Sequence, residues 1–216
     1  MLDNLGFAVV NFAAIFFVVD PFAVIPLFLS ITSGDDDAKK SHTALKAAIV
    51  TTVTLLAFAA TGSLIFRLFG ITLGAFRIAG GILLFLLALD MVRAQHSRVR
   101  VSPEEQTEGV EKEDVAIIPL GIPMLAGPGS IAIVIVLMSH ARSSPVQMGI
   151  VLGCVLLTGV LTFLILRAAT VLERTLHQTG LNILNRVMGL LLAAVAVQFV
   201  VNGVAEVLPQ IMKALG

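Results

Sequence analysis

Two short segments of this chain combine prolines with residues that can bind a small charged solute. In the first, Asp20 stands directly before Pro21, and Phe22, Ala23 and Pro26 follow. An ionisable carboxylate in an apolar run can pair with an ammonium group, bind a cation or carry a proton. Its alternative role is structural, because aspartate is a common cap for a helix whose first residue is proline.

The second segment is rich in glycine and lies about a hundred residues later, where Gly127, Pro128, Gly129 and Ser130 follow two further prolines. A helix that begins at Pro128 would present unbonded N–H groups and the positive end of its dipole to an anion. Glycine lets a ligand approach this backbone closely. We therefore predict one half of a zwitterion site at Gly127, Gly129 and Ser130.

The other half of the predicted site consists of Asp20, Phe22 and Ala23. An ammonium group would face this half, and a carboxylate would face the glycine-rich half. The alternative is that both segments are merely kinks, with small residues that allow helices to pack closely.

Composition places these segments in a membrane protein. The 216 residues are 57% hydrophobic and only 13% charged, with a mean hydropathy of +1.01, whereas soluble domains are roughly 25% charged. The lipid bilayer is thus an expected partner. A net charge of zero gives no reason to expect nucleic acid as a partner.

Six apolar runs are each long enough to cross a bilayer as a helix. They cover residues 6–32, 44–69, 71–92, 115–139, 146–171 and 181–208. The fold predicted is an all-α polytopic membrane protein with six transmembrane helices. The two proline segments fall near the middle of the first and fourth runs, so these two spans are expected to be broken inside the membrane.

The halves of the chain resemble each other. The segment from Arg77 to Leu83 is similar to that from Arg186 to Leu192, 109 residues later, and Gly127-Pro128 follows Asp20-Pro21 by 107 residues. A repeat of three spans must enter the membrane from opposite sides, which predicts a 3+3 inverted repeat. The halves are residues 1–92 and 115–216, joined by a charged cytoplasmic linker at 93–114. Chance similarity between apolar helices is the alternative.

Basic residues predict the orientation. The loops after the first, third and fifth runs hold nine Lys and Arg residues, and the opposite side holds three. Cytoplasmic loops carry the excess of positive charge, so both termini are expected outside the cytoplasm, in a multi-pass protein of the inner membrane.

Further polar residues interrupt the apolar runs. Asn11 lies in the first run and either lines a solute path or bonds a neighbouring helix. Gln198, Asn202 and Glu206 recur every four residues and share one helix face. Gln198 and Asn202 are either part of a solute path or hydrogen-bond between helices, while Glu206, near the outer end, is expected to be solvated.

Arg77 and Arg186 hold equivalent places in the two halves. Each either anchors its helix at the membrane surface by snorkelling or gates one side of a pathway by pairing with a carboxylate. Small residues such as Gly149 and Gly153 predict helix contacts within one chain or between copies, so a homo-oligomer is a further expectation.

Several of these motifs together resemble the MarC family of bacterial and archaeal inner-membrane proteins, over essentially the whole chain. The resemblance is carried by Asp20-Pro21-Phe22 with Ile25-Pro26, Arg77-Ile78-Ala79-Gly80-Gly81, Ala126-Gly127-Pro128-Gly129-Ser130, Gln198-Phe199 and Asn202-Gly203. It implies six spans and, from the SnatA-like branch of the family, transport of small neutral amino acids such as glycine and alanine. Ala23 and Val24 depart from the Gly-Asn of the family motif and make this segment more apolar.

The predicted function is a secondary transporter of small neutral amino acids that works by alternating access, with a cation or a proton as coupling partner. The alternatives are an exporter or channel for another small solute, and a membrane protein that assembles with partners without transporting. The sequence contains no hydrolase or nucleotide-binding motif, so no enzyme activity and no cofactor or metal are predicted.

Overall fold

The computed structural model describes residues 2–93 and 116–215, and every element in these ranges is helical. In chain order the elements are α1 (Leu2–Val19), α2 (Pro21–Ile31), α3 (Asp37–Phe69), α4 (Leu73–Val92), η1 (Ala116–Leu125), α6 (Pro128–Ala141), α7 (Pro145–Arg167) and α8 (Ala169–Leu215). Only Arg93 of the predicted charged linker is described, and its N–H caps α4 by bonding the Leu89 carbonyl at 3.0 Å.

The described helices confirm an all-helical membrane protein with five or six candidate spans. Five segments are long and apolar enough: Asn4–Ile31, Asp37–Gly62, Leu73–Val92, Pro145–Arg167 and Asn182–Pro209. The pair η1 and α6 makes a sixth span if it is counted as one, and its two helices are bent by 58°. The predicted interruptions of the first and fourth runs are both present, at Asp20 and at residues 126–127.

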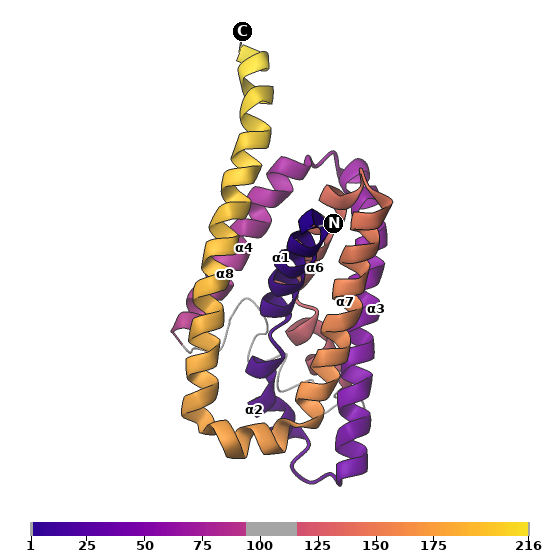
Figure 1. Cartoon of the computed structure of the whole chain (residues 1–216), viewed down its shortest axis with the longest axis vertical. Helices are drawn as coiled ribbons and strands as arrows, with labels where there is room; N and C mark the ends of the chain where they lie inside the picture. The colour runs from indigo at the N-terminus through magenta and orange to yellow at the C-terminus, as the bar shows by residue number, and fades with distance from the viewer. Residues whose placement is uncertain (1, 94–115, 216) are drawn as a thin grey trace.

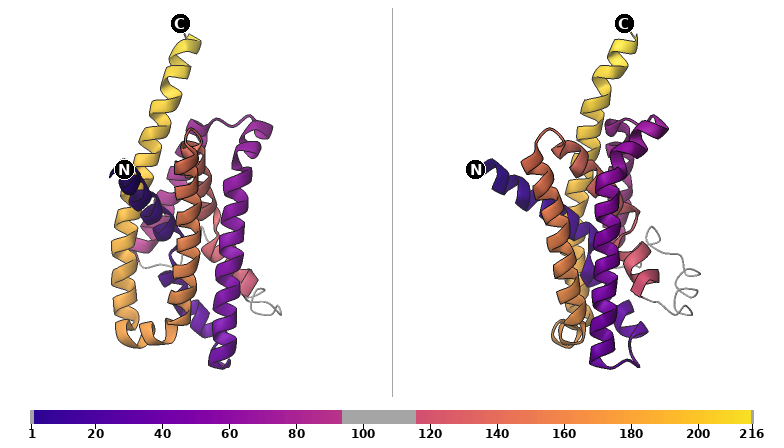
Figure 2. Two further views of the ribbon diagram at one scale, coloured as in Figure 1. Left: turned by 45° about the vertical axis from the view of Figure 1, so that its right-hand side comes forward. Right: turned by 90° about the vertical axis from the view of Figure 1, so that its right-hand side faces the viewer.

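The helices form two outer pairs with the broken spans between them (Figure 1). On one side α4 packs along α8, and on the other α3 packs along α7. α1 and α6 lie between these pairs and contact each other. The start of α1 and the end of α8 point toward the same end of the bundle in every view (Figures 1 and 2), which agrees with counting η1 and α6 as one span.

Close backbone contact joins α4 to α8. A Cβ atom added at Gly81 would lie 2.8 Å from the Ala196 carbonyl oxygen, and one added at Gly203 would lie 2.7 Å from the Gly74 carbonyl oxygen. Because a carbonyl oxygen of a helix cannot move aside, these glycines are what allow the two helices to approach so closely.

Helix boundaries differ from the sequence expectation in two places. α8 begins at Ala169, so residues 172–180, between the fifth and sixth apolar runs, are helical. This segment contains Leu, Glu, Arg and Gln, which favour helix, and Figure 1 shows the first part of α8 crossing the bottom of the bundle before it turns upward. α3 begins already at Asp37, because the Asp36 side chain caps it by accepting from the Lys39 N–H at 2.8 Å.

Pro26 does not interrupt the first span, although its missing N–H and its ring suggested that it would. α2 continues through it to Ile31, and the break is confined to Asp20. Pro26 is the sixth of the 11 residues of α2, where the helix loses one internal hydrogen bond and still packs its apolar face in the core.

Candidate solute-binding site

The first break is closed by its own side chain. Asp20 has the left-handed backbone geometry φ 48°, ψ 67°, which aspartate tolerates better than most residues, and it is fully buried. Its Oδ1 accepts a hydrogen bond from the Ala23 N–H at 3.3 Å. The structural role considered for Asp20, as the cap of α2, is therefore present, and the carboxylate lies at the positive end of α2.

The second break has no such cap. Gly127 is extended at φ −77°, ψ 174°, and no side chain caps α6. Pro128 is the first helical residue, so the N–H groups of Gly129 and Ser130 lie in the first turn, where the helix itself supplies no acceptor. The Ser130 hydroxyl does not cap the helix either, because it donates to the Leu125 carbonyl at 2.8 Å. The start of α6 is thus an uncapped helix N-terminus near the middle of its span.

Prolines in η1 explain why the chain before α6 is unwound. Ile118 and Ile122, which precede Pro119 and Pro123, have extended backbone angles inside an otherwise helical stretch. Ala126 donates to the Gly121 carbonyl five residues earlier, at 2.9 Å. This bond closes a wide helical turn just before Gly127, and a Cβ atom at Gly127 would lie 2.6 Å from the Pro123 carbonyl oxygen.

A small cavity lies at this helix start, between α1, α4, η1 and α6. Its volume is about 10 Å³ for the centre of a water molecule, which is room for about one water. The lining residues are Val18, Leu83, Leu87, Met124, Gly127, Pro128, Gly129 and Ser130. The glycine-rich half of the predicted site thus lines one cavity, and its walls are mostly apolar.

The first break lies beside this cavity without lining it. Val18, two residues before Asp20, is a lining residue, and its Cγ1 would be 3.3 Å from a Cβ atom added at Gly129. Phe22 and Ala23 are half-buried at the start of α2, and Phe22 packs edge-on against Phe16.

Asn11 lies apart from the breaks. It is nine residues before Asp20, which is roughly 13 Å along a helix. The side chain is 2% exposed, and its Nδ2 donates to the Phe7 carbonyl at 2.6 Å. Its Oδ1 has no hydrogen bond among the described residues. Asn11 is therefore a buried polar group of α1 away from the cavity.

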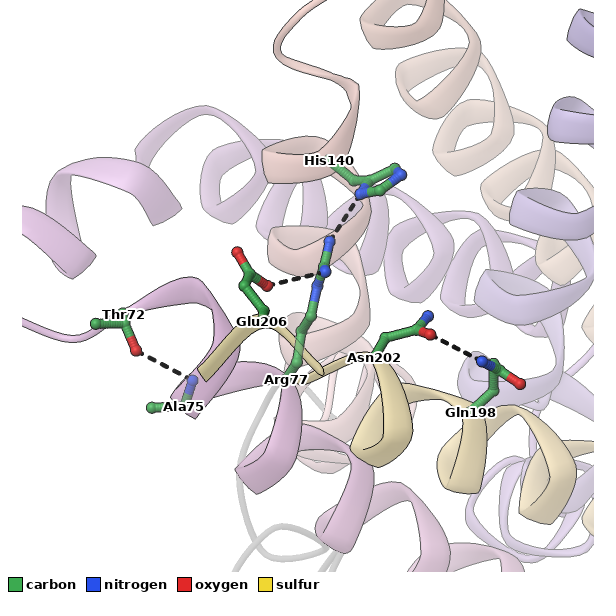
Figure 3. Close-up of polar contacts among 7 residues, drawn as sticks. All are labelled: Thr72, Ala75, Arg77, His140, Gln198, Asn202 and Glu206. Atoms are coloured by element: carbon green, nitrogen blue, oxygen red, sulfur yellow. Dashed lines mark hydrogen bonds and ion pairs between the residues drawn. The ribbon is translucent and has the colours of Figure 1, made fainter. Parts of the chain in front are cut away.

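The polar stripe of α8 does not reach the cavity either. Gln198 and Asn202 are exposed, and Gln198 Nε2 donates to Asn202 Oδ1 at 2.8 Å (Figure 3). Four residues further, Glu206 pairs with Arg77 of α4 at 3.0 Å, so the expectation that Glu206 is merely solvated is incomplete. Arg77 Nη2 also lies 2.7 Å from Nδ1 of His140 in the last turn of α6 (Figure 3).

This ion pair bears on the two roles considered for the equivalent arginines. Arg77 pairs with a carboxylate, as the gating alternative required, and thereby connects α4, α6 and α8 at one end of the bundle. Arg186 is exposed, as an anchoring residue would be.

Sequence reasoning missed the apolar walls of the cavity. Val18, Leu83, Leu87 and Met124 carry no local signal, because apolar residues fill most of every span. Within the part of the chain that the structure describes, no group of three or more His, Cys, Asp or Glu side chains is placed to hold a metal ion.

The fold and the candidate site define the class of protein: a multi-pass helical membrane protein with a bent span and an uncapped half-helix at its centre. Comparison with known proteins gives the family. The family model described as "MarC family integral membrane protein" matches residues 5–208. The chain therefore belongs to the MarC family.

Several relatives match over nearly their full length. UPF0056 membrane protein MJ1677 of Methanocaldococcus jannaschii is 39% identical over 201 residues, covering 93% of this chain and 97% of its own. UPF0056 membrane protein YvbG of Bacillus subtilis is 36% identical, covering 94% of this chain and 97% of its own. UPF0056 membrane protein YhcE of Escherichia coli is 33% identical, covering 94% of both. No solved structure matches the chain.

Proposed function

We propose that this protein is a secondary transporter of small neutral amino acids that works by alternating access, with a cation or a proton as coupling partner. One observation carries the proposal: an uncapped helix N-terminus opens onto a small cavity near the middle of a broken span. Unwound backbone at membrane depth is tolerated where it lines a site, and discontinuous helices of this kind form the substrate sites of many transporters.

The substrate carboxylate would bind the N–H groups of Gly129 and Ser130. Those groups and the dipole of α6 favour an anion without any arginine. The substrate ammonium would face the side of the first break, where the buried Asp20 carboxylate supplies the negative charge. Val18 and Leu87 line the cavity beside these groups, and their apolar bulk favours a substrate with a small side chain.

The structure represents a closed state in this mechanism. A cavity for about one water is too small for an amino acid, so binding requires the walls to separate. At one end of the bundle, the contacts of Arg77 with Glu206 and His140 hold α4, α8 and α6 together. We infer that the contact between Arg77 and His140 breaks when the site opens toward that end, while α4 and α8 stay paired.

An inverted 3+3 repeat is part of the proposal, and the packing supports it. α1 packs on α7 as η1 packs on α3, and α2 contacts α8 as α6 contacts α4. Each broken span also resumes at a proline, Pro21 in one and Pro128 in the other. Exchanging the two halves therefore preserves these two pairs of contacts.

The proposed location is the inner membrane with both termini outside the cytoplasm. The connection between α2 and α3 and the end of α7 lie at the end of the bundle opposite the termini (Figure 1), and the loops on that side carry most of the basic residues. A C-terminal fusion to a reporter that is active only outside the cytoplasm should be active. Activity of a cytoplasmic reporter at the same position would contradict this orientation.

Transport is tested by counterflow in proteoliposomes of the purified protein. Labelled glycine or alanine should accumulate, saturably, in vesicles preloaded with the unlabelled compound. A panel of small amino acids should also raise the Tm of the protein, because a ligand that prefers the folded state stabilises it. Flux of other solutes alone would favour an exporter or channel, and absence of any flux would favour an assembly protein.

A matched pair of variants connects that flux to the cavity. Gly129→Ala places a methyl group 3.3 Å from side-chain atoms of Val18 and Leu84, inside the proposed site, and should reduce exchange strongly. Gly153→Ala meets nothing within 4 Å and should leave exchange unchanged. Equal exchange by the two variants would place the substrate elsewhere.

A further inference from the structure

The outward face of α8 carries a regular seam that nothing in the chain covers among the described residues. Its members are exposed and are spaced alternately by four and three residues: Val187, Leu191, Ala194, Gln198, Val201, Ala205 and Leu208. Its large apolar members are 48% to 53% exposed. We call this set the outer seam of α8. Its spacing is that of the contact positions of a left-handed helix pair.

The outer seam faces away from the α4 contact. Ala196 and Gly203 belong to the α8 face that touches α4, and Gln198 lies two residues from Ala196, which is about 200° around a helix. Exposed valine and leucine on this face are unremarkable for a helix in lipid, because hydrocarbon solvates them. Gln198 requires a different explanation.

An exposed amide pair lies within the membrane span of α8. Gln198 and Asn202 fall inside the span Asn182–Pro209, with Gln198 close to its midpoint. Their mutual bond uses Gln198 Nε2 and Asn202 Oδ1. It leaves one acceptor, Gln198 Oε1, and one donor, Asn202 Nδ2, without a hydrogen bond among the described residues. Lipid tails cannot satisfy either group, so both favour a partner that also presents amides at this depth.

We propose that α8 pairs along its outer seam with α8 of a second copy of this chain, in a parallel two-fold dimer. Two copies inserted the same way present the same donor and the same acceptor at the same depth, which makes the surface self-complementary. A single polar residue in an otherwise apolar seam is a known device that fixes the register of paired helices. Ala194 and Ala205, above and below it along the chain, allow the two backbones to approach closely.

Disulfide crosslinking in native membranes tests the proposal on the full chain. Cys154 is the single cysteine, so a Cys154→Ala background permits one new cysteine at a time. Ala194→Cys and Val201→Cys should each form a dimer on oxidation. Val53→Cys on α3 and Leu157→Cys on α7 are comparably exposed controls on other faces and should not crosslink.

Replacing the amide of Gln198 tests whether this residue fixes the register of the two helices. Gln198→Leu should lower the association constant of the dimer about tenfold, measured as the monomer fraction on dilution in lipid, because the two-fold axis creates two equivalent interhelical hydrogen bonds and both are lost. Its Tm in detergent should stay unchanged, since the side chain lies outside the core of the chain. The proposal is overturned if the control cysteines crosslink as readily, if the seam cysteines crosslink to a different protein, or if the undiluted protein is monomeric in lipid. The proposed dimer does not depend on which solute the protein transports.

Discussion

The two breaks in this molecule occupy matching places in their spans, but a side chain caps the helix start at the first and not at the second. At the first, Asp20 Oδ1 accepts from the Ala23 N–H, so a side-chain oxygen already fills the start of α2. At the second, Gly127 offers no side chain, and the start of α6 stays open. The comparison shows that a broken helix does not by itself leave an open end, and that the residue before the proline decides whether a side chain caps the helix.

The largest effect on stability and exchange is expected from adding a methyl group at the second break, where the start of α6 is uncapped. Gly127→Ala places a methyl group 2.6 Å from the Pro123 carbonyl oxygen, and this neighbour is backbone, which cannot move aside as a flexible side chain could. We expect a loss of about 1–3 kcal/mol of stability, measured by Tm in detergent, together with loss of exchange. Gly149→Ala, which meets nothing within 4 Å in α7, should instead stabilise by about 0.5–1 kcal/mol. A neutral Gly127→Ala variant would show that the open break needs no glycine.

The next effect concerns the self-capped break. Asp20→Ala removes the cap of α2 and forces alanine into left-handed geometry, which should cost about 2 kcal/mol of stability. Asp20→Asn keeps a capping oxygen and tolerates the same backbone angles, so it should lose much less stability.

The same pair of variants separates the charge of Asp20 from its role as the cap of α2. If the Asp20 carboxylate binds the coupling ion, Asp20→Asn should abolish uptake driven by a pH or ion gradient while the protein stays folded. Vesicles in which Asp20→Asn retains full coupled uptake would leave this carboxylate with the capping role alone.

A smaller effect tests whether the start of α6 binds the solute through its backbone N–H groups. Ser130→Ala removes the hydroxyl bond to the buried Leu125 carbonyl and should cost about 1 kcal/mol in stability. The N–H groups of the first turn remain, so half-saturation of exchange should hardly change. Thr61→Ala removes a similar bond at an exposed position and should be nearly neutral. A large rise in half-saturation for Ser130→Ala would mean that the hydroxyl itself binds the solute.

The smallest effect lies at the far ends of the two half-helices. α2 ends locally, with the Thr32 hydroxyl bonded to the Phe28 carbonyl at 2.7 Å, whereas the last turn of α6 is connected through His140 and Arg77 to Glu206. Glu206→Gln should cost only about 0.5 kcal/mol at low salt and less at high salt. A double-mutant cycle with Arg77→Gln measures the coupling. A coupling energy of zero would show that the pair of Arg77 and Glu206 does not stabilise the closed state.

Sequence could locate the breaks because proline acts locally. Pro21 and Pro128 mark the first helical residues of α2 and α6, as expected from a residue that lacks an N–H and has a fixed φ. The same reasoning overestimated Pro26, because burial of one helix face outweighs the loss of one hydrogen bond.

Sequence could not determine which polar residues meet. Gln198, Asn202 and Glu206 share a stripe by spacing, yet among the described residues only Glu206 has a partner on another helix, because the crossing of α4, α6 and α8 brings Arg77 to it and not to the others. The walls of the cavity depend in the same way on which apolar side chains face inward. Periodicity is weak evidence for this in spans that are apolar on every side.

The glycine contacts between α4 and α8 also restrict how the molecule can open. With carbonyl oxygens within 3 Å of where the Cβ atoms at Gly81 and Gly203 would be, neither helix can rotate about its own axis without a steric clash. α4 and α8 must therefore travel as one rigid body. At Gly80, by contrast, an added Cβ atom would be 3.6 Å from the Ala132 side chain of α6, which is ordinary van der Waals spacing. Sliding is easiest along this surface, so the transport mechanism proposed above would place the entry route for solute between α4 and α6.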